Sequence, residues 1–160
     1  MTPKREHFVE VDEDIPMTVQ WAGYASLREA PRSVVLDAGA SLVEVKTDRD
    51  TSEVVELVLI DIARPESREA PLDAPGVLDP GVPLVVFDES SQPQDRSAGG
   101  VRLYADGVRI RLGEGHAARG VGDSGAVFGF SDPGHWIKFD VRLDPDRMAR
   151  LRALCRAGDA

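Results

Sequence analysis

Two stretches of the chain share one pattern, in which two apolar arms flank a polar tip. Ala40–Ile62 reads ASLVEVKT, DRDTSE and VVELVLIDI, and Gly125–Leu143 reads GAVFGF, SDPGH and WIKFDVRL. Val, Leu, Ile and Phe fit a pleated, half-buried surface, whereas Asp, Ser, Thr and Gly satisfy turn geometry at the tips. Both stretches are therefore predicted to be β-hairpins, and their repetition suggests a domain built from two related halves.

The second arm of the first hairpin, Val54–Ile60, is apolar on both faces apart from Glu56. A strand with two apolar faces is typical of a central position in a sheet that is covered on both sides. We therefore expect this arm to be a central strand and Leu57 to lie in the core.

Shorter strand patterns occupy much of the remaining chain. They are His7–Val11, Met17–Trp21, Ser33–Leu36, Leu84–Phe87 and a hairpin of Val101–Tyr104 and Val108–Leu112 around an Asp-Gly turn. Leu84–Phe87 is predicted to be a buried strand, and the glycine-rich segment Gly113–Ser124 is predicted to be irregular.

The middle of the chain is rich in proline, with five of the eleven prolines between Arg64 and Pro83. Proline fixes φ and has no N–H to donate, so this stretch is predicted to form neither a strand nor a helix. We expect a connector, 64–82, between halves 1–63 and 83–160. The polar stretch 88–100 is predicted to be a mobile tip or a disordered insert, most mobile at Gln92–Gly100. Either loop is an alternative place for a binding site.

The chain ends with one helical pattern. Asp144 is a suitable N-cap, and Pro145 follows at the first helical position, where its missing N–H costs nothing. The apolar residues that recur at helical spacing and are expected to pack on a sheet are Met148, Leu151, Leu154 and Cys155. The arginines that are expected to form a solvated face are Arg147, Arg150, Arg152 and Arg156.

Closely spaced strand patterns without intervening helices predict a mainly β protein. We expect one domain, 1–160, in the form of a two-sheet antiparallel sandwich or a half-open barrel, pseudo-duplicated, with one C-terminal helix. A length of 160 residues is sufficient for a single domain with a sizeable core.

Composition and charge limit the partners and the cellular location that we expect for the protein. The net charge of −9, with no Lys/Arg cluster evident in the core of the chain, argues against a nucleic-acid partner. No apolar run approaches the ~18 residues that cross a bilayer, and the first residues lack the apolar segment of a signal peptide. The single Cys155 excludes an intramolecular disulfide and is typical of a reducing compartment. The predicted location is therefore cytoplasmic, without a membrane partner.

Gly122-Asp123-Ser124-Gly125 is the sharpest local motif, and it resembles the nucleophile segment of chymotrypsin-like serine proteases. The resemblance implies Ser124 as nucleophile, with the N–H groups of Gly122 and Ser124 as an oxyanion hole. It covers four residues only. That family places its catalytic His well upstream behind several strands, whereas His7 has only six residues before it. The motif is therefore interpreted as a tight turn that leads into a strand.

Other motifs do not predict a metal or a cofactor. His7, His116 and His135 are scattered without zinc-ligand spacing, and the acidic tip 48–53 lacks the ordered positions of an EF-hand loop. No phosphate-binding glycine loop precedes a helix pattern. The sequence thus predicts no catalytic, cofactor-binding or metal-binding residues.

The leading hypothesis is a small, acidic, cytoplasmic, non-enzymatic binding module with a protein partner. An immunity or antitoxin-like protein is one concrete form, because negative charge speeds association with a basic partner. One alternative is a hydrolase that uses Ser124, with His116 or His135 as the base and Asp123 or Asp140 as the acid. Another is a structural β-domain that assembles with itself through an exposed edge strand. The sequence does not predict the oligomeric state.

Overall fold

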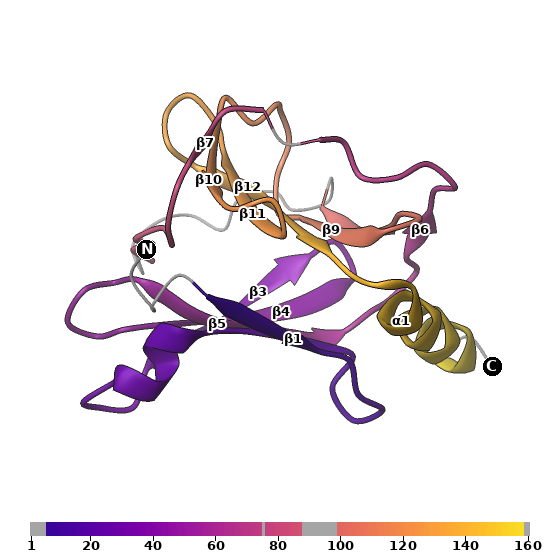
Figure 1. Ribbon diagram of the computed structural model, residues 1–160, viewed down its shortest axis with the longest axis horizontal. Coiled ribbons are helices and arrows are strands. Elements are labelled where there is room, and N and C mark those ends of the chain that lie inside the picture. The colour runs from indigo at the N-terminus through magenta and orange to yellow at the C-terminus, as the bar shows by residue number, and fades with distance from the viewer. Residues whose placement is uncertain (1–5, 75, 88–98, 159–160) are drawn as a thin grey trace.

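The computed structural model describes residues 6–74, 76–87 and 99–158 as two face-to-face β-sheets with a C-terminal helix at one end of both layers (Figure 1). The first sheet consists of β1 (His7–Glu10), β2 (Met17–Trp21), β3 (Arg32–Ala38), β4 (Ser41–Thr47) and β5 (Val54–Asp61). The second consists of β6 (Glu66–Ser67), β7 (Leu78–Asp79), β8 (Gly100–Leu103), β9 (Gly107–Arg111), β10 (Arg119–Gly122), β11 (Ala126–Phe130) and β12 (Trp136–Arg142). A short 3-10 helix, η2 (Ala22–Ser26), follows β2, and α1 (Pro145–Gly158) ends the described chain.

The two sheets repeat one strand order. The first sheet runs β1-β2-β5-β4-β3, and the second contains β8-β9-β12-β11-β10, with β6 and β7 added at its two edges. All neighbouring strands within each five-strand unit are antiparallel. The two hairpins of the sequence pattern, β4–β5 and β11–β12, therefore occupy equivalent places. The mainly β prediction is confirmed as a two-sheet sandwich, and the described strands form no closed barrel.

The core lies between the sheets and draws side chains from both. Val54 to Leu59 are all buried, which confirms β5 as a central strand covered on both faces. Trp21 of the first sheet packs on Phe128 and Phe139 of the second, with ring centroids 5.4 and 6.1 Å apart. These aromatic contacts join the two layers into one core.

The proline-rich connector forms two short strands, so the prediction that it contains none is wrong. β6 pairs in parallel with β8, and β7 pairs in parallel with β10. Each of these strands has only two residues, and both fit between the prolines that the sequence rule concerns. The missing proline N–H groups therefore do not interrupt the pairing.

Two further segment predictions need correction. Leu84–Phe87 is not a buried strand: it makes one isolated bridge, from Leu84 to Glu53, and Leu84 and Val86 are 64% and 77% exposed. Only its alternate residues, Val85 and Phe87, pack against the core. Gly113–Ser124 is not wholly irregular, because it contains β10. The predicted loop 88–100 lies, apart from Gly99 and Gly100, outside the described residues.

The C-terminal helix begins as predicted. Asp144 Oδ1 accepts a hydrogen bond from the Arg147 N–H at 2.8 Å, and this bond lowers the pKa of Asp144. Met148 and Leu151 are buried, while Leu154 and Cys155 pack half-buried against the core, so the predicted apolar stripe is confirmed. No helix in the described residues has the length and apolar character needed to cross a membrane.

Two helix arginines do more than face solvent, which corrects the prediction of a solvated face. The Arg147 guanidinium donates to the carbonyl oxygen of Val9 in the first sheet at 3.1 Å. The Arg152 guanidinium donates to the carbonyl oxygen of Tyr104, beside β8 in the second sheet, at 2.7 Å. Arg150 is exposed. The helix thus binds both layers.

Candidate functional site

The outer face of the second sheet carries a group of cations. Strands β8, β9 and β12 direct Val101, Ile110 and Phe139 into the core, so the alternate residues point outward. These outward cations are Arg102, Arg109, Arg111, Lys138 and Arg142. The sequence has no run of Lys and Arg in the core of the chain, and these cations come together only because β8, β9 and β12 are neighbours in the sheet.

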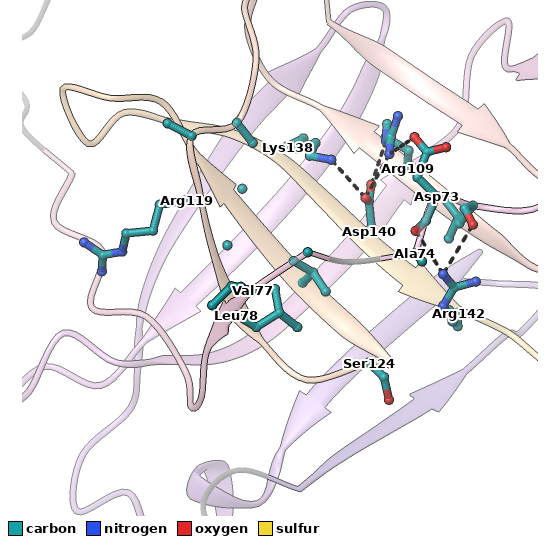
Figure 2. Close-up of a pocket in the computed structure, with 17 residues that line it drawn as sticks. Asp73, Ala74, Val77, Leu78, Arg109, Arg119, Ser124, Lys138, Asp140 and Arg142 are labelled. Atoms are coloured by element: carbon teal, nitrogen blue, oxygen red, sulfur yellow. Dashed lines mark hydrogen bonds and ion pairs between the residues drawn. The ribbon is translucent and has the colours of Figure 1, made fainter.

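The connector crosses this face (Figure 1). Between the connector and the sheet lies a pocket of about 330 Å³ (Figure 2). We call residues 72–74 and 76–78 the strap, and the space beneath them the strap pocket. The floor of the pocket is formed by residues of β10, β11 and β12, among them Val127, Gly129 and Lys138. The volume lies at the low end of the ~300–1,000 Å³ range of small-molecule sites.

Two leucines fix the ends of the strap on glycines of the sheet. A Cβ atom on Gly107 would lie 2.3 Å from Cδ1 of Leu72, and one on Gly120 would lie 2.7 Å from Cδ2 of Leu78. A Cβ atom on Gly107 would also lie 2.5 Å from the backbone carbonyl oxygen of Val141, so Leu72 packs where a glycine is required, whereas a side chain at position 120 would require the Leu78 methyl group to shift. The backbone N–H of Leu72 also donates to Asp106 Oδ1 at 2.8 Å.

A carboxylate surrounded by cations forms one wall of the pocket. Asp140 accepts hydrogen bonds from Nε and Nη2 of Arg109 at 2.8 and 3.1 Å, and from Nζ of Lys138 at 3.2 Å (Figure 2). The side chains of Asp140 and Arg109 are only 14% and 10% exposed. The hydrogen bonds to Asp140 raise the pKa of Arg109 although burial opposes this. The paired charges therefore compensate each other in a partly desolvated position.

Arg142 ties the strap to the sheet. Its guanidinium binds Asp106 at 2.6 Å and donates to the carbonyl oxygens of Leu72 and Asp73 at 3.3 and 3.0 Å. The Asp73 carboxylate lies 3.7 Å from Nη2 of Arg109. The strap is thus held by charged contacts as well as by its two leucines.

The lining of the pocket combines an excess of positive charge with apolar surface. The charged residues are Arg109, Arg119, Lys138 and Arg142 against Asp73 and Asp140. The apolar part includes Leu72, Val77, Leu78, Ala117, Ala118 and Val127. Such a lining favours a small ligand that has both an anionic and an apolar part.

The residues of the serine-protease resemblance lie at one end of the same pocket. Ser124 is exposed, and its hydroxyl points away from the group around Asp140 (Figure 2). Asp123 Oδ1 accepts the N–H groups of Gly125 and Ala126 at 2.7 and 3.0 Å, as in a tight turn before a strand. Sequence reasoning missed that Nδ1 of His7 lies 3.4 Å from Asp123 Oδ2, a contact between the two sheets.

The other candidate residues are not brought together with Ser124. His116 and His135 are exposed, and neither forms a hydrogen bond with Ser124 in the described part of the chain. Asp140 is engaged by Arg109 and Lys138. Among the described residues, no three His, Cys, Asp or Glu side chains gather in a way that could hold a metal ion.

Comparison of the sequence with protein-family models and with curated proteins finds no match. The inference of function therefore depends on the strap pocket and on its charges. A signal for the basic face was present in VRLYADGVRIRL, where Arg102, Arg109 and Arg111 alternate with buried residues. The strand pairing needed to join them to Lys138 was not evident from that segment alone.

Proposed function

We propose that this protein is a non-enzymatic binding module whose ligand occupies the strap pocket. The observation that carries the proposal is the pocket lining, in which the mostly buried cations Arg109 and Lys138 share one mostly buried carboxylate, Asp140, beside apolar surface. Charges in a partly enclosed space act on a nearby ligand more strongly than distant surface charges do, because solvent and salt screen the distant ones. The apolar strap and floor supply the remaining contact surface.

Nitrogen–proton correlation NMR with a set of small anionic and neutral compounds tests this proposal. We expect shifts at strap residues such as Val77 and at Gly129 and Lys138, which line the pocket. Signals of Lys46 and Glu56, on the outer face of the other sheet, should stay unchanged. If no compound shifts the pocket residues, the proposal is wrong.

The sequence favours a different form of binding module, in which a protein partner binds the acidic surface and not the strap pocket, with an immunity or antitoxin-like role as its concrete version. The support is the net charge of −9, which favours association with a basic partner. Capture from native lysate at low and high salt, followed by identification of the bound proteins, tests it. We expect a basic partner that is released by salt, and the absence of any salt-sensitive partner would contradict this version.

The contact between His7 and Asp123 gives a specific reason to keep a serine hydrolase as a second candidate. It places the imidazole of His7 against the carboxylate of Asp123, the residue that precedes Ser124. A fluorophosphonate probe decides between the two functions, with Ser124→Ala as the matched control. Labelling of the wild type that disappears in this variant would favour the hydrolase. No labelling, while a known serine hydrolase in the same tube reacts, would exclude it.

A further inference from the structure

We propose that the strap pocket binds a carboxylate attached to a short aliphatic chain, supplied either by a small organic acid or by the C-terminus of a peptide. This inference rests on the proposed binding function and names the chemical class of the ligand. It follows from the donors that the pocket leaves available, from its local charge and from its apolar wall.

The available donors belong to Lys138. An ammonium group has three N–H donors, and in the described residues the only hydrogen-bond partner of this one is Asp140, at 3.2 Å. The side chain of Lys138 is 20% exposed and lines the pocket. Two of its donors are therefore open to a ligand in the pocket.

The arginine side chains around the pocket are already engaged. Arg109 binds Asp140 through two nitrogens and Tyr104 through the third. Arg142 binds Asp106 and two strap carbonyl groups. Arg119 pairs with the exposed Asp79 at 2.9 Å, and its side chain extends away from the pocket in Figure 2.

The charge that remains matches a monoanion. Among the mostly buried charged side chains, Arg109 and Lys138 share one carboxylate, Asp140; the second carboxylate near Arg109, that of Asp73, is 87% exposed, so solvent screens its charge. A phosphate would use arginine forks, which bind two of its oxygens at once; the forks of Arg109 and Arg142 are occupied, and Arg119 extends away from the pocket (Figure 2). A carboxylate carries one negative charge, which the ammonium group of Lys138 can balance while it donates hydrogen bonds.

The apolar wall explains why an aliphatic chain should accompany the carboxylate. Leu78, Ala118 and Val127 line the pocket near the small residues Gly120 and Gly129. Apolar surface that a ligand covers contributes about 25 cal/mol per Å² of buried area. The pocket volume of about 330 Å³ restricts this contribution to a short chain.

Titration of the full chain with acetate, butyrate and hexanoate, followed by NMR shifts of the pocket residues, tests the proposal. Binding should tighten by up to about fourfold for each added methylene. Hexanoate should bind about fivefold to tenfold more tightly than hexanamide, which has the same chain without the charge. Peptides with a free or an amidated C-terminal leucine form the second arm, and the arm with tighter binding identifies the source.

Two cations that face each other across the ladder provide a matched pair of variants. Lys138→Gln should remove the preference for hexanoate over hexanamide. Arg111→Gln should leave this preference unchanged, because Arg111 lies directly opposite Lys138 on the same face but does not line the pocket. Should Lys138→Gln fail to fold, Ala118→Leu at an exposed wall position should block both ligands, and the wild-type comparison still tests the charge.

The outcomes separate this inference from the proposed function. Equal binding of hexanoate and hexanamide at the pocket would overturn the carboxylate but leave a binding module. Tighter binding of inorganic phosphate than of hexanoate would also overturn the carboxylate. If no probe shifts the NMR signals of any pocket residue, both proposals are wrong.

Discussion

The outer faces of the two sheets differ although their strand orders are the same. Each central strand directs one nearly buried carboxylate outward, Glu56 in β5 and Asp140 in β12. Glu56 binds Nζ of Lys46 at 3.0 Å and Nε2 of Gln20 at 2.7 Å. Over this first face lies η2, whose Tyr24 ring is 5.9 Å from the Lys46 ammonium.

The second face is covered differently, and this decides where a ligand can bind. Its cover is the strap, which rests on the sheet through Leu72 and Leu78 and leaves a pocket between them. Side chains of η2 and of the sheet cover the first face, whereas the strap spans the second face and leaves space beneath it. The same five-strand arrangement thus has a closed outer surface in the first sheet and a pocket in the second. The difference depends on which segment covers the central strand.

The largest expected effect concerns the core that the two sheets share. Leu57→Ala should lower the free energy of unfolding by about 2–5 kcal/mol, because Leu57 is fully buried in the central strand β5. Ile60→Ala, in the same strand but 40% exposed, should cost about 1 kcal/mol or less. Urea denaturation measures both. A loss below about 1 kcal/mol for Leu57→Ala would show that β5 is not covered on both faces.

The next test compares the two outward carboxylates directly. Asp140→Asn should cost roughly 2–4 kcal/mol, because it leaves the nearly buried Arg109 with only the 87% exposed Asp73, 3.7 Å away, as a counter-charge. Glu56→Gln should cost about 1 kcal/mol, since the amide can still bond Gln20 and the partner Lys46 is 23% exposed. Urea unfolding of both variants at one pH gives the difference. Equal losses would mean that the two faces are energetically alike.

A smaller effect is expected where α1 binds the sheets. Arg152→Ala should cost about 1 kcal/mol, because the carbonyl group of Tyr104 loses a charged donor. Arg150→Ala, at an exposed position of the same helix, should change stability by less than about 0.5 kcal/mol. Thermal unfolding of the two variants distinguishes them, and similar midpoints would contradict a bracing role for Arg152.

The smallest expected effect is a pH dependence of stability that the Lys46–Glu56 pair has and the Arg109–Asp140 pair lacks. Burial alone would lower the pKa of Lys46, but the hydrogen bond and the charge of Glu56 outweigh it, so this pKa lies above its ordinary value of 10.5. The resulting stabilisation is complete below pH 10.5 and is lost as the pH rises through the folded-state pKa. Arg109 has a raised pKa and stays charged throughout, so the Arg109–Asp140 pair of the second face has no such dependence.

Lys46→Arg should therefore reduce the loss of unfolding free energy at alkaline pH by about 0.5 kcal/mol relative to the wild type. Urea midpoints of the two proteins, compared at pH 9 and above pH 11, measure the change. The two proteins differ only at residue 46, so contributions from distant groups cancel in the difference. Parallel curves would show that the pair with Glu56 adds nothing.

Local patterns predicted the elements of the fold better than the site. The hairpins and α1 were evident because alternation, turn residues and the Asp144 cap act between near neighbours. The strap pocket was not, since it requires two-residue strands to pair in parallel with distant ones. The contact of His7 with Asp123 depends on the packing of one sheet on the other, which no segment of sequence specifies alone.

Each sheet is made from one uninterrupted stretch of chain, residues 7–61 and 66–142, and this has a consequence for synthesis on the ribosome. The first sheet can pair all its strands before the second has emerged, because none of its partners lies further along the chain. Its inner face, with Trp21 and Leu57, then stays open to water until the later half arrives. The nascent sheet is exposed to aggregation and to chaperones during that interval. The interval ends when the second sheet packs on the first and α1, which follows both sheets in the chain, binds both layers.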